Sequence, residues 1–422
     1  MVRRVTDEGA FSNRLLPALL ERSRLSARDR ALATELAYGT LRRLLVIDAA
    51  LATLVDRPLT RAPARARAAL RLGAYQVLST RIPSHAAVGE SVSLVSGKER
   101  GFVNAVLRRL VANPPGHPTG GGDEDVALRS GVAPWAVAEL RRLVPDEVEA
   151  AASALAMQGP MTLRVNRCRS AARRLEEALR AAGLDPRRGR LHRHSLLVAG
   201  AGQATGLPGF ADGWFAVQDQ ASAWVVDVLD PRPEDLVLDA CAGPGGKAAD
   251  IACRAGFVIA ADVSGSRARL VTESAERLGV TAGVLVQDAA RPALRDGFDR
   301  VLVDAPCSGI GAARRRPELL WRPERRDLSR LARLQVRLAL GAASLLRPGG
   351  RLVYSVCTFP RAETDAACDA LLGKAPFLEP DPFVGPEGQE VTRARVWPHR
   401  HDTDAMFVAR FRRVGGPRIA PG

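Results

Sequence analysis

Hydrophobic residues recur at helical spacing through the first quarter of the chain. Leu15, Leu19 and Leu20 share one face of a predicted helix, and the same period continues over residues 31–54 with a break near Gly39. Further helices are predicted over residues 64–80, 88–95 and 102–111, separated by Pro83 and Gly101. Because no strand pattern interrupts these segments, residues 1–112 are predicted to form an all-helical bundle.

The next hundred residues have a different pattern. Residues 113–125, NPPGHPTGGGDED, lack apolar periodicity and are dense in proline and glycine, which is typical of a linker. Over residues 126–214 a strand is predicted at 161–166, a helix at 171–182 ending at Gly183, and a strand at 195–198. This pattern predicts a small, arginine-rich α+β subdomain. Its arginines are expected either to contact phosphate groups or to form a solvated basic face.

From residue 215 to residue 422 short apolar runs alternate with helical segments. Strands are predicted at residues 236–240, 258–262, 284–288, 301–304, 351–355 and 406–411, and the clearest helix spans 327–346 before Pro348-Gly349-Gly350. Alternation at this spacing predicts an α/β domain with a doubly wound, Rossmann-like parallel sheet.

Two of these strands end in a cysteine. The apolar run at 301–303 leads into Asp304-Ala305-Pro306-Cys307-Ser308-Gly309, and the strand at 351–355 is followed by Val356 and Cys357. Open α/β sheets bind ligands at the carboxyl ends of their strands, so an acid and two thiols are predicted to meet there. A single cysteine in this position is commonly a buried small hydrophobe, but a pair beside an acid favours covalent chemistry.

The first strand of the sheet leads into a glycine-rich turn. Asp239-Ala240-Cys241-Ala242-Gly243-Pro244-Gly245-Gly246-Lys247 precedes a helix, and the next strand ends at Asp262, 23 positions after Asp239. The turn lacks the last glycine of a dinucleotide fingerprint, and Ala248 replaces the hydroxyl residue of a P-loop. Acids at three strand ends, including Asp288, suit a ribose and a cationic amino acid better than a pyrophosphate. S-adenosylmethionine is the predicted cofactor.

The charge of the chain points to a polyanionic partner. Lysine and arginine total 61 against 46 acidic residues, a formal net charge of +15. RNA or DNA is the first candidate, although nearly all of the positive charge is arginine, which genome composition also favours. Neither a membrane span nor the apolar core of a signal peptide is present, so a cytoplasmic location is predicted.

The cysteines and histidines do not indicate a metal site. The six cysteines include no CxxC pair, and all are expected to be reduced in the cytoplasm. The pairs His192/His194 and His399/His401 lack the partners of a zinc site, so a surface position or local hydrogen bonding is expected of them.

Two thiols near a methyl donor predict methylation of an unreactive carbon such as cytosine C5. Addition of a thiolate to C6 creates an enamine that is nucleophilic at C5, and a base then removes the C5 proton as the thiolate leaves. An acid must support N3 as charge builds there, and Asp304 is placed for that role.

The chain resembles two known families over nearly its whole length. DRAL at 29–32, LAYGTLR at 36–42, LRLGAYQ at 70–76 and FVNAVLR at 102–108 resemble the RNA-binding helical domain of the NusB type. MTLRVN, VQDQASAW, DACAGPGGK, DVSGSRARL, VLVDAPCSGIG, YSVCTFP and WPHRHDTDAMFVARF resemble the Sun/Fmu RNA 5-methylcytosine methyltransferases. The pairing of the two resembles bacterial methyltransferases of 16S rRNA cytosine C5.

The resemblance implies roles for individual residues. It makes Cys357 the nucleophile and Cys307 the residue that releases the product. It implies cofactor contacts by Cys241, Ala242, Gly243, Pro244, Gly245, Gly246, Lys247, Asp262, Arg267, Asp288 and Asp304. Two departures are Gly243, where the family more often has alanine, and Val356, where threonine is usual.

Several alternatives stay open on the sequence alone. The substrate is 16S rRNA in an early ribosomal subunit, tRNA or another RNA, and a non-enzymatic RNA-binding assembly factor is a further reading. A DNA cytosine methyltransferase would attack through Cys307, and the second cysteine argues against that alternative. The spacing of the glycines argues against a dinucleotide oxidoreductase. A monomer is expected. A basic face that grips the RNA backbone is predicted from Arg314, Arg315, Arg316, Arg322, Arg325 and Arg326.

Overall fold

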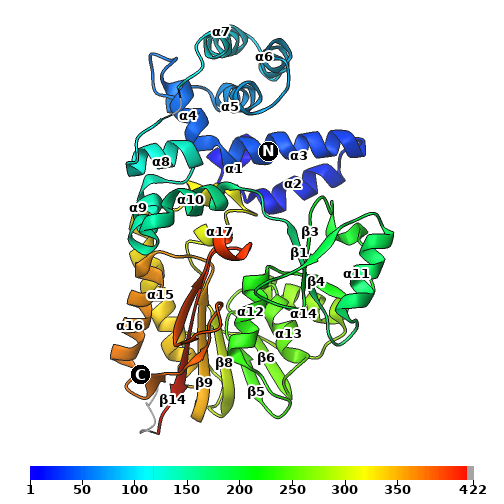
Figure 1. The fold of residues 1–422 in the computed structure, drawn as a ribbon, viewed down its shortest axis with the longest axis vertical. Coiled ribbons are helices and arrows are strands. Elements are labelled where there is room, and N and C mark those ends of the chain that lie inside the picture. The colour runs from blue at the N-terminus through cyan, green and yellow to red at the C-terminus, as the bar shows by residue number, and fades with distance from the viewer. Residues whose placement is uncertain (117, 416–422) are drawn as a thin grey trace. The chain divides into compact units, whose positions relative to one another are not determined.

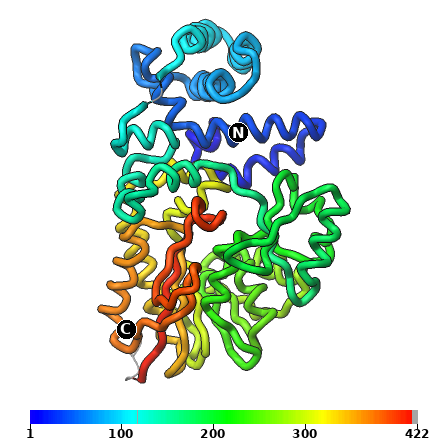
Figure 2. The backbone as a smooth tube through the Cα atoms, in the orientation of Figure 1, coloured from blue at the N-terminus to red at the C-terminus, as the bar shows by residue number. Residues whose placement is uncertain are grey.

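The computed structural model describes residues 1–116 and 118–415 and divides into two compact units. The first unit holds residues 1–158 together with 312–324, and the second holds 159–311 and the chain from 325 onward. His117, within the predicted linker, lies outside the described residues. Figure 1 shows the elements of each unit, and Figure 2 traces the backbone through them.

The first unit is helical, as the periodicity predicts. Its α-helices are α1 (Val2–Asp7), α2 (Ser12–Glu21), α3 (Ala27–Arg42), α4 (Leu44–Ala52), α5 (Ala64–Ser79), α6 (Ser84–Ser93), α7 (Lys98–Ala112), α8 (Asp123–Ser130), α9 (Pro134–Leu143) and α10 (Val148–Ala156). The break expected near Gly39 lies at Arg43, between α3 and α4, so Gly39 itself does not end the helix. Gly39 lies under the Tyr75 ring, where an added Cβ would come within 2.1 Å of that ring. The glycine therefore serves close packing rather than a turn.

The chain returns to the first unit over residues 312–324. Buried Glu318 accepts hydrogen bonds from the Ser12 amide at 3.1 Å and the Ser12 hydroxyl at 2.6 Å. Arg322 donates to the carbonyls of Val5 and Ala10, each at 2.8 Å. This short segment, which includes the 3-10 helix η5 (Pro317–Leu320), is thus built into the packing of the first unit.

The predicted RNA-gripping arginine face needs a correction for two of its members. Arg314 is buried, and the Arg322 guanidinium is committed to backbone carbonyls. Both therefore have a role in packing the segment against the first helices. Arg325 and Arg326, at the start of α15 (Arg325–Ala343), are exposed.

The second unit begins with a small α+β layer. The strands β1 (Met161–Val165), β2 (Pro186–Arg188), β3 (Ser195–Val198) and β4 (Phe215–Val217) form an antiparallel sheet in the order β2-β3-β1-β4. Helix α11 (Ala172–Ala181) packs Leu175 and Leu179 against this sheet. The α+β pattern begins at β1, whereas α8 to α10 of the predicted 126–214 segment pack with the first unit.

The larger sheet of this unit has the order β10-β14-β9-β8-β5-β6-β7. Five strands are parallel, namely β5 (Leu236–Asp239), β6 (Phe257–Asp262), β7 (Gly283–Val286), β8 (Phe298–Asp304) and β9 (Leu346–Val356). Strand β14 (Met406–Arg413) runs antiparallel to β9 and pairs with β13 (Arg393–Val396) and β10 (Leu378–Pro380). The all-parallel sheet predicted from strand–helix alternation is therefore mixed at this edge, because β13 and β14 are joined only by the short helix α17 (Pro398–His401). A two-residue ribbon, β11 (Phe383–Val384) and β12 (Glu390–Val391), stands apart.

Helices cover both faces of the larger sheet (Figure 1). Helices α15 and α16 (Asp365–Lys374) pack on one face, and α12 (Gln220–Leu229) and α13 (Gly246–Ala252) pack on the other. Helix α14 (Gly265–Leu278) follows β6. Successive strands proceed outward from β5 through β6 to β7, and then cross to β8 and β9 on its other side. The carboxyl ends of β5 and β8 meet at this change of direction, which is where such sheets bind ligands.

One expectation about the cysteines is also wrong. Cys168 and Cys253 form a disulfide with their Cα atoms 5.8 Å apart, within the range that a bridge requires. Cys241, Cys307, Cys357 and Cys368 are free thiols. The pairing joins residues 85 positions apart, which the spacing of cysteines along the chain does not reveal.

Candidate active site

The two strand-end thiols lie side by side. Strands β8 and β9 are parallel neighbours with Asp304 opposite Ser355, so the residues that follow them emerge together. The Sγ atoms of Cys307 and Cys357 are 3.4 Å apart. The hydrogen bond with Cys357 and burial raise the pKa of the Cys307 thiol well above its ordinary value. Cys307 is therefore protonated at neutral pH while Cys357 lies within hydrogen-bond reach of it.

A buried carboxylate holds the two cysteine loops together. Glu363 accepts hydrogen bonds from the Ser308 amide at 2.9 Å and from the Ser308 hydroxyl at 2.6 Å. The Thr358 hydroxyl lies 2.7 Å from the Ser308 hydroxyl and 3.5 Å from Glu363. Ser308 and Thr358 directly follow Cys307 and Cys357, so Glu363 sets the separation of the loops that carry the thiols.

An ion pair lies at the carboxyl end of β8, close to the same strands. The Lys247 ammonium lies 2.6 Å from Asp304 Oδ2, and the Ser355 hydroxyl donates to Oδ1 at 2.8 Å. Burial lowers the pKa of Lys247, but the attraction of Asp304 and its hydrogen bond outweigh burial and raise that pKa above its ordinary value. The lysine is charged, and it connects the glycine-rich turn after β5 with the acid after β8.

The glycine-rich turn has no room for side chains at two positions. A Cβ at Gly243 would lie 2.7 Å from Asp262 Oδ2 and from Arg267 Cβ. Gly245 has a φ of +103°, and a Cβ there would lie 2.9 Å from Val271 Cα. The alanine that is common in the family at the Gly243 position would require Asp262 or Arg267 to shift.

The acid at the end of β6 organises the turn from the other side. Asp262 accepts hydrogen bonds from the Gly243 amide at 3.1 Å and the Ser264 amide at 3.0 Å. Arg267 lies 3.2 Å from the same carboxylate and donates to the Gly243 carbonyl at 2.7 Å. The structure therefore brings together Asp262, Arg267 and the turn that begins at Cys241.

Asp239, at the end of β5, is a buried acid whose carboxyl group is poorly satisfied. Neither carboxyl oxygen accepts a side-chain hydrogen bond from the described residues, although the backbone N–H of Cys241 donates to the group and lowers its pKa. Burial raises the pKa of Asp239 to about 7, and the positive charge of Lys247 opposes this effect in part. A cofactor that carries positive charge and hydrogen-bond donors, as S-adenosylmethionine does, fits a site with such an unsatisfied acid.

Asp288 stands apart from these contacts. It is exposed beyond the end of β7, and its carboxylate accepts a hydrogen bond from the Ala290 amide at 2.9 Å. The hydrogen bonds and ion pairs described above do not include it. Its predicted part in cofactor binding stays a prediction.

Sequence reasoning missed the residue that joins the small sheet to the turn. Arg164, on β1, is 1% exposed, donates to Gln218 Oε1 at 2.6 Å and pairs with buried Asp250 at 3.3 Å. A further donation at 3.2 Å reaches the Gly246 carbonyl. The arginine-rich subdomain was predicted to contact phosphate or to form a solvated face, but this arginine anchors the turn. The MTLRVN motif includes Arg164, but only the fold shows which residues Arg164 contacts.

None of the helices in the described part of the chain combines the length and apolar character that a bilayer crossing requires. Over the same residues, histidine, cysteine and acidic side chains form no group of three or more that could hold a metal ion. His192 instead contacts the Ser195 hydroxyl through Nδ1 at 2.9 Å.

Comparison with known proteins identifies the family. Residues 226–412 match the family described as 16S rRNA methyltransferase RsmB/F, residues 1–112 match the NusB family, and residues 133–205 match an RsmF/B-like ferredoxin-like domain. The chain is 34% identical to a probable ribosomal RNA small subunit methyltransferase B of Bacillus subtilis, over 96% of this chain and 95% of that protein. Identity to the ribosomal RNA small subunit methyltransferase B of Serratia proteamaculans is 32%, over 97% and 96%.

A solved structure agrees with these matches. The methyltransferase homologue from Pyrococcus horikoshii superposes with a TM-score of 0.60 at 26% identity, over 70% of this chain and all of that one. The architecture predicted from the sequence, a helical NusB-like region, a small α+β subdomain and a Rossmann-like sheet, is confirmed. The chain belongs to the 16S rRNA methyltransferase RsmB/F family.

Proposed function

We propose that the protein methylates C5 of a cytosine in 16S rRNA through a covalent bond between Cys357 and C6. Its cofactor is S-adenosylmethionine, which supplies an electrophilic methyl group on a positively charged sulfur. The observation that carries the proposal is the 3.4 Å separation of the Cys307 and Cys357 sulfurs beside the Lys247–Asp304 ion pair. Neither phosphoryl nor hydride transfer calls for two neighbouring thiols.

The two thiols have different tasks in this proposal. The Cys357 thiolate forms a bond to C6, and the electron pair of the C5–C6 double bond becomes available at C5. After methylation, removal of the C5 proton restores the double bond and expels Cys357 as a thiolate. A thiol whose pKa is raised gives a strongly basic thiolate. Once the Cys307 thiol has lost its own proton to solvent, its thiolate accepts the C5 proton, which leaves Cys307 as a thiol and Cys357 as a thiolate.

The Lys247–Asp304 ion pair stabilises the cytosine ring while negative charge develops on that ring. Addition at C6 pushes negative charge toward N3 and O2 of the ring, where a positioned cation or acid is worth about a hundredfold to a thousandfold in rate. Asp304 is committed to Lys247 and Ser355, so it acts as a carboxylate that accepts a hydrogen bond. We assign to Lys247 the donation of a hydrogen bond to the ring, a role that sequence reasoning had given to Asp304.

Two cysteine variants test the proposal on a 16S rRNA transcript. Cys357→Ala is expected to abolish methyl transfer and adduct formation. Cys307→Ala is expected to accumulate a covalent protein–RNA species that survives denaturing electrophoresis. The reverse behaviour of the two variants would overturn the assignment of roles, and methylation at full rate by Cys357→Ala would overturn the covalent mechanism.

The choice of RNA rests on the names of the relatives and on the helical domain. Bisulfite mapping of rRNA and tRNA from a strain that lacks the gene tests it. Loss of 5-methylcytosine from 16S rRNA alone supports the proposal, whereas loss from tRNA would favour the alternative substrate. The cytoplasmic location and the monomeric state stay predictions.

A further inference from the structure

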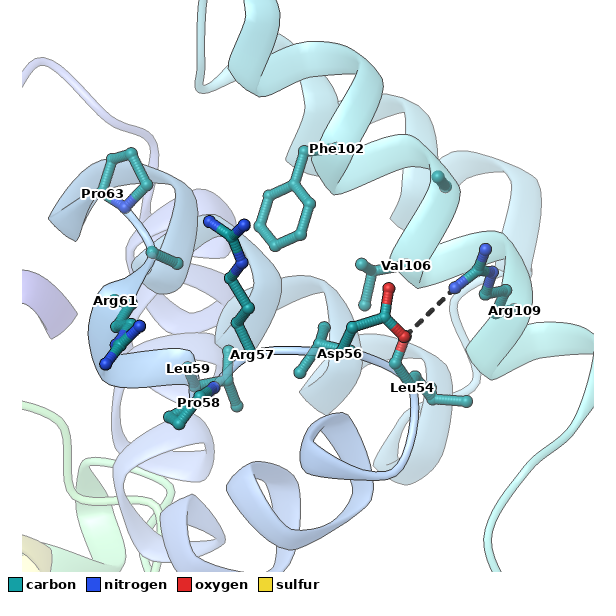
Figure 3. Close-up of a pocket in the computed structure, with 13 residues that line it drawn as sticks. Leu54, Asp56, Arg57, Pro58, Leu59, Arg61, Pro63, Phe102, Val106 and Arg109 are labelled. Atoms are coloured by element: carbon teal, nitrogen blue, oxygen red, sulfur yellow. Dashed lines mark hydrogen bonds between the residues drawn. The ribbon is translucent and has the colours of Figure 1, made fainter.

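The helical unit contains a pocket far along the chain from the thiols. It lies between helix α7 and the segment that joins α4 to α5, and it encloses about 460 Å³ (Figure 3). Pockets that bind small organic groups have volumes of about 300 to 1,000 Å³. This one is large enough for a single nucleotide, whereas a double helix would not enter it.

One aromatic side chain and three arginines line this pocket. Phe102 is 37% exposed, although Val103 and Val106 on the same helix are buried. Phe102 and Arg109 are seven positions apart and so share one face of α7. Arg57 and Arg61 come from the facing segment, and Figure 3 shows Arg57 extending toward the Phe102 ring.

The two guanidinium groups on the facing segment are uncommitted. Within residues 1–116 and 118–415, the side chains of Arg57 and Arg61 make neither a hydrogen bond nor an ion pair that the structure resolves, and both are exposed. Arg109, by contrast, donates to the Leu54 carbonyl at 3.3 Å. Asp56 lies at the Arg109 end of the pocket in Figure 3, so the end near Arg57 and Arg61 is the one suited to an anion.

The floor of the pocket is preformed. Val106 lines it and is 3% exposed, because it also belongs to the core that α5 and α7 share. A rigid apolar floor, an exposed aromatic ring and two uncommitted cations are the parts with which proteins hold an unstacked base and its phosphates. A site that is already formed loses little entropy when it binds.

We propose that this pocket binds one unstacked nucleotide of the RNA substrate. The base stacks on Phe102, and the adjoining phosphates contact Arg57 and Arg61. This inference rests on the proposed function in one respect, namely that the substrate is RNA. It adds a recognition site in the helical unit to the reaction site in the sheet unit.

Filter binding of a protein-free 16S rRNA transcript to the full-length protein, over a series of salt concentrations, tests the proposal. Phe102→Leu keeps the apolar contact but loses the aromatic ring, and it is expected to weaken binding by about 5- to 150-fold with an unchanged salt slope. Phe102→Trp retains a stacking surface and is expected to restore binding. The double variant Arg57→Ala/Arg61→Ala is expected to lower the slope of log affinity against log salt by about 1.4, the value for two phosphate contacts on a single strand.

Arg108→Ala is the matched control. Arg108 lies on the same helix, is exposed and does not line the pocket, so the salt slope should stay unchanged. Ultraviolet cross-linking gives an independent readout. A nucleotide adduct is expected on the tryptic peptide that spans residues 101–108, which contains Phe102.

The outcomes separate this inference from the proposed function. Wild-type affinity and slope for the Phe102 and arginine variants, or a slope change in Arg108→Ala as large as in the double variant, would overturn the pocket. Adducts confined to other peptides would overturn it as well. A wild-type protein that binds the transcript but does not methylate it would overturn the proposed function and leave the binding comparison valid.

Discussion

Replacement of Glu363 by glutamine tests whether the spacing of the two thiols limits the rate. The Glu363 carboxylate is completely buried and is shared by the loops that carry Cys307 and Cys357. Burial raises its pKa, and the hydrogen bonds that it accepts from Ser308, Gln335 and Thr358 oppose that rise. Glutamine has the same shape but one acceptor oxygen fewer.

The structure indicates how the glutamine will lie. One carboxylate oxygen faces two N–H donors, the Ser308 amide and the Gln335 amide, each at 2.9 Å. The other faces hydroxyl groups, which are able to rotate and accept. The new NH2 group will therefore turn toward the hydroxyls. Two charge-assisted hydrogen bonds become neutral ones, at a cost of about 1 kcal/mol each, and removal of a buried charge returns part of that.

We therefore expect Glu363→Gln to lower the free energy of unfolding by only about 1 to 2 kcal/mol. Its effect on catalysis should be larger, because a displacement of about 1 Å in a reacting group costs about a hundredfold in rate. We expect kcat to fall by about 10- to 100-fold, with an unchanged KM for S-adenosylmethionine, since Glu363 contacts none of the residues in the glycine-rich turn.

The assay is methyl transfer at saturating RNA and cofactor, together with the rate of adduct formation in the Cys307→Ala background. Glu387→Gln, a change at an exposed position of the same unit, is the matched control. Unchanged kcat and adduct rate in Glu363→Gln would refute the positioning role. An equal loss of cofactor affinity and kcat would instead indicate general disruption of the fold.

Three further changes are expected to separate the roles of charged residues. Burial raises the pKa of Asp239 to about 7, so the stability that protonated Asp239 gives the folded state is complete at low pH and is lost as pH rises. In thermal or urea unfolding, the free energy of unfolding of Asp239→Asn, relative to that of the wild type, should therefore rise by about 3 kcal/mol from about pH 5 to about pH 8. An equal difference between variant and wild type at both pH values would contradict this reasoning. Arg164→Met removes one partner of buried Asp250, which keeps an ion pair with Arg254 at 3.0 Å. Urea unfolding should therefore show that the free energy of unfolding falls by about 3 kcal/mol, the low end of the usual range for a broken buried pair. A fall below about 1 kcal/mol would contradict this reasoning. Lys247→Met should reduce methyl transfer and adduct formation by about a hundredfold or more, measured in single turnover, and a wild-type adduct rate would rule out its role at the ring.

The residues around the active site show where sequence reasoning succeeds. Strands β5, β6, β8 and β9 lie close to their predicted positions, because a buried parallel strand needs a continuous apolar run that local sequence reveals. Parallel strands of one sheet end at a common edge, so the acids and thiols that follow them could be assigned to one site before the fold was known. Helices α5, α6, α7, α11 and α15 were likewise predicted within a few residues, whereas α8, α9 and α10 were not predicted.

The errors have a common cause. A helix break was predicted near Gly39, but the helix ends at Arg42, and Gly39 makes room for a ring 36 positions away. Arg314 and Arg322 were predicted to grip RNA, but their segment packs with the first helices of the chain. The disulfide of Cys168 with Cys253 and the antiparallel direction of β14 also depend on partners that are distant in the sequence. Periodicity and composition describe only neighbours along the chain.

The sequence by itself determined the elements, the order of the strands along the chain and the residue types at their ends, since these depend on local periodicity and on backbone preferences. Only the tertiary structure decided that two sulfurs lie 3.4 Å apart, that Glu363 ties their loops together and that Asp239 is buried without a side-chain donor. Distances, desolvation and shared hydrogen bonds arise when separate segments exclude water from one another. The residue types therefore suggested a chemistry for the site, whereas the positions and charge states that would permit that chemistry came from packing.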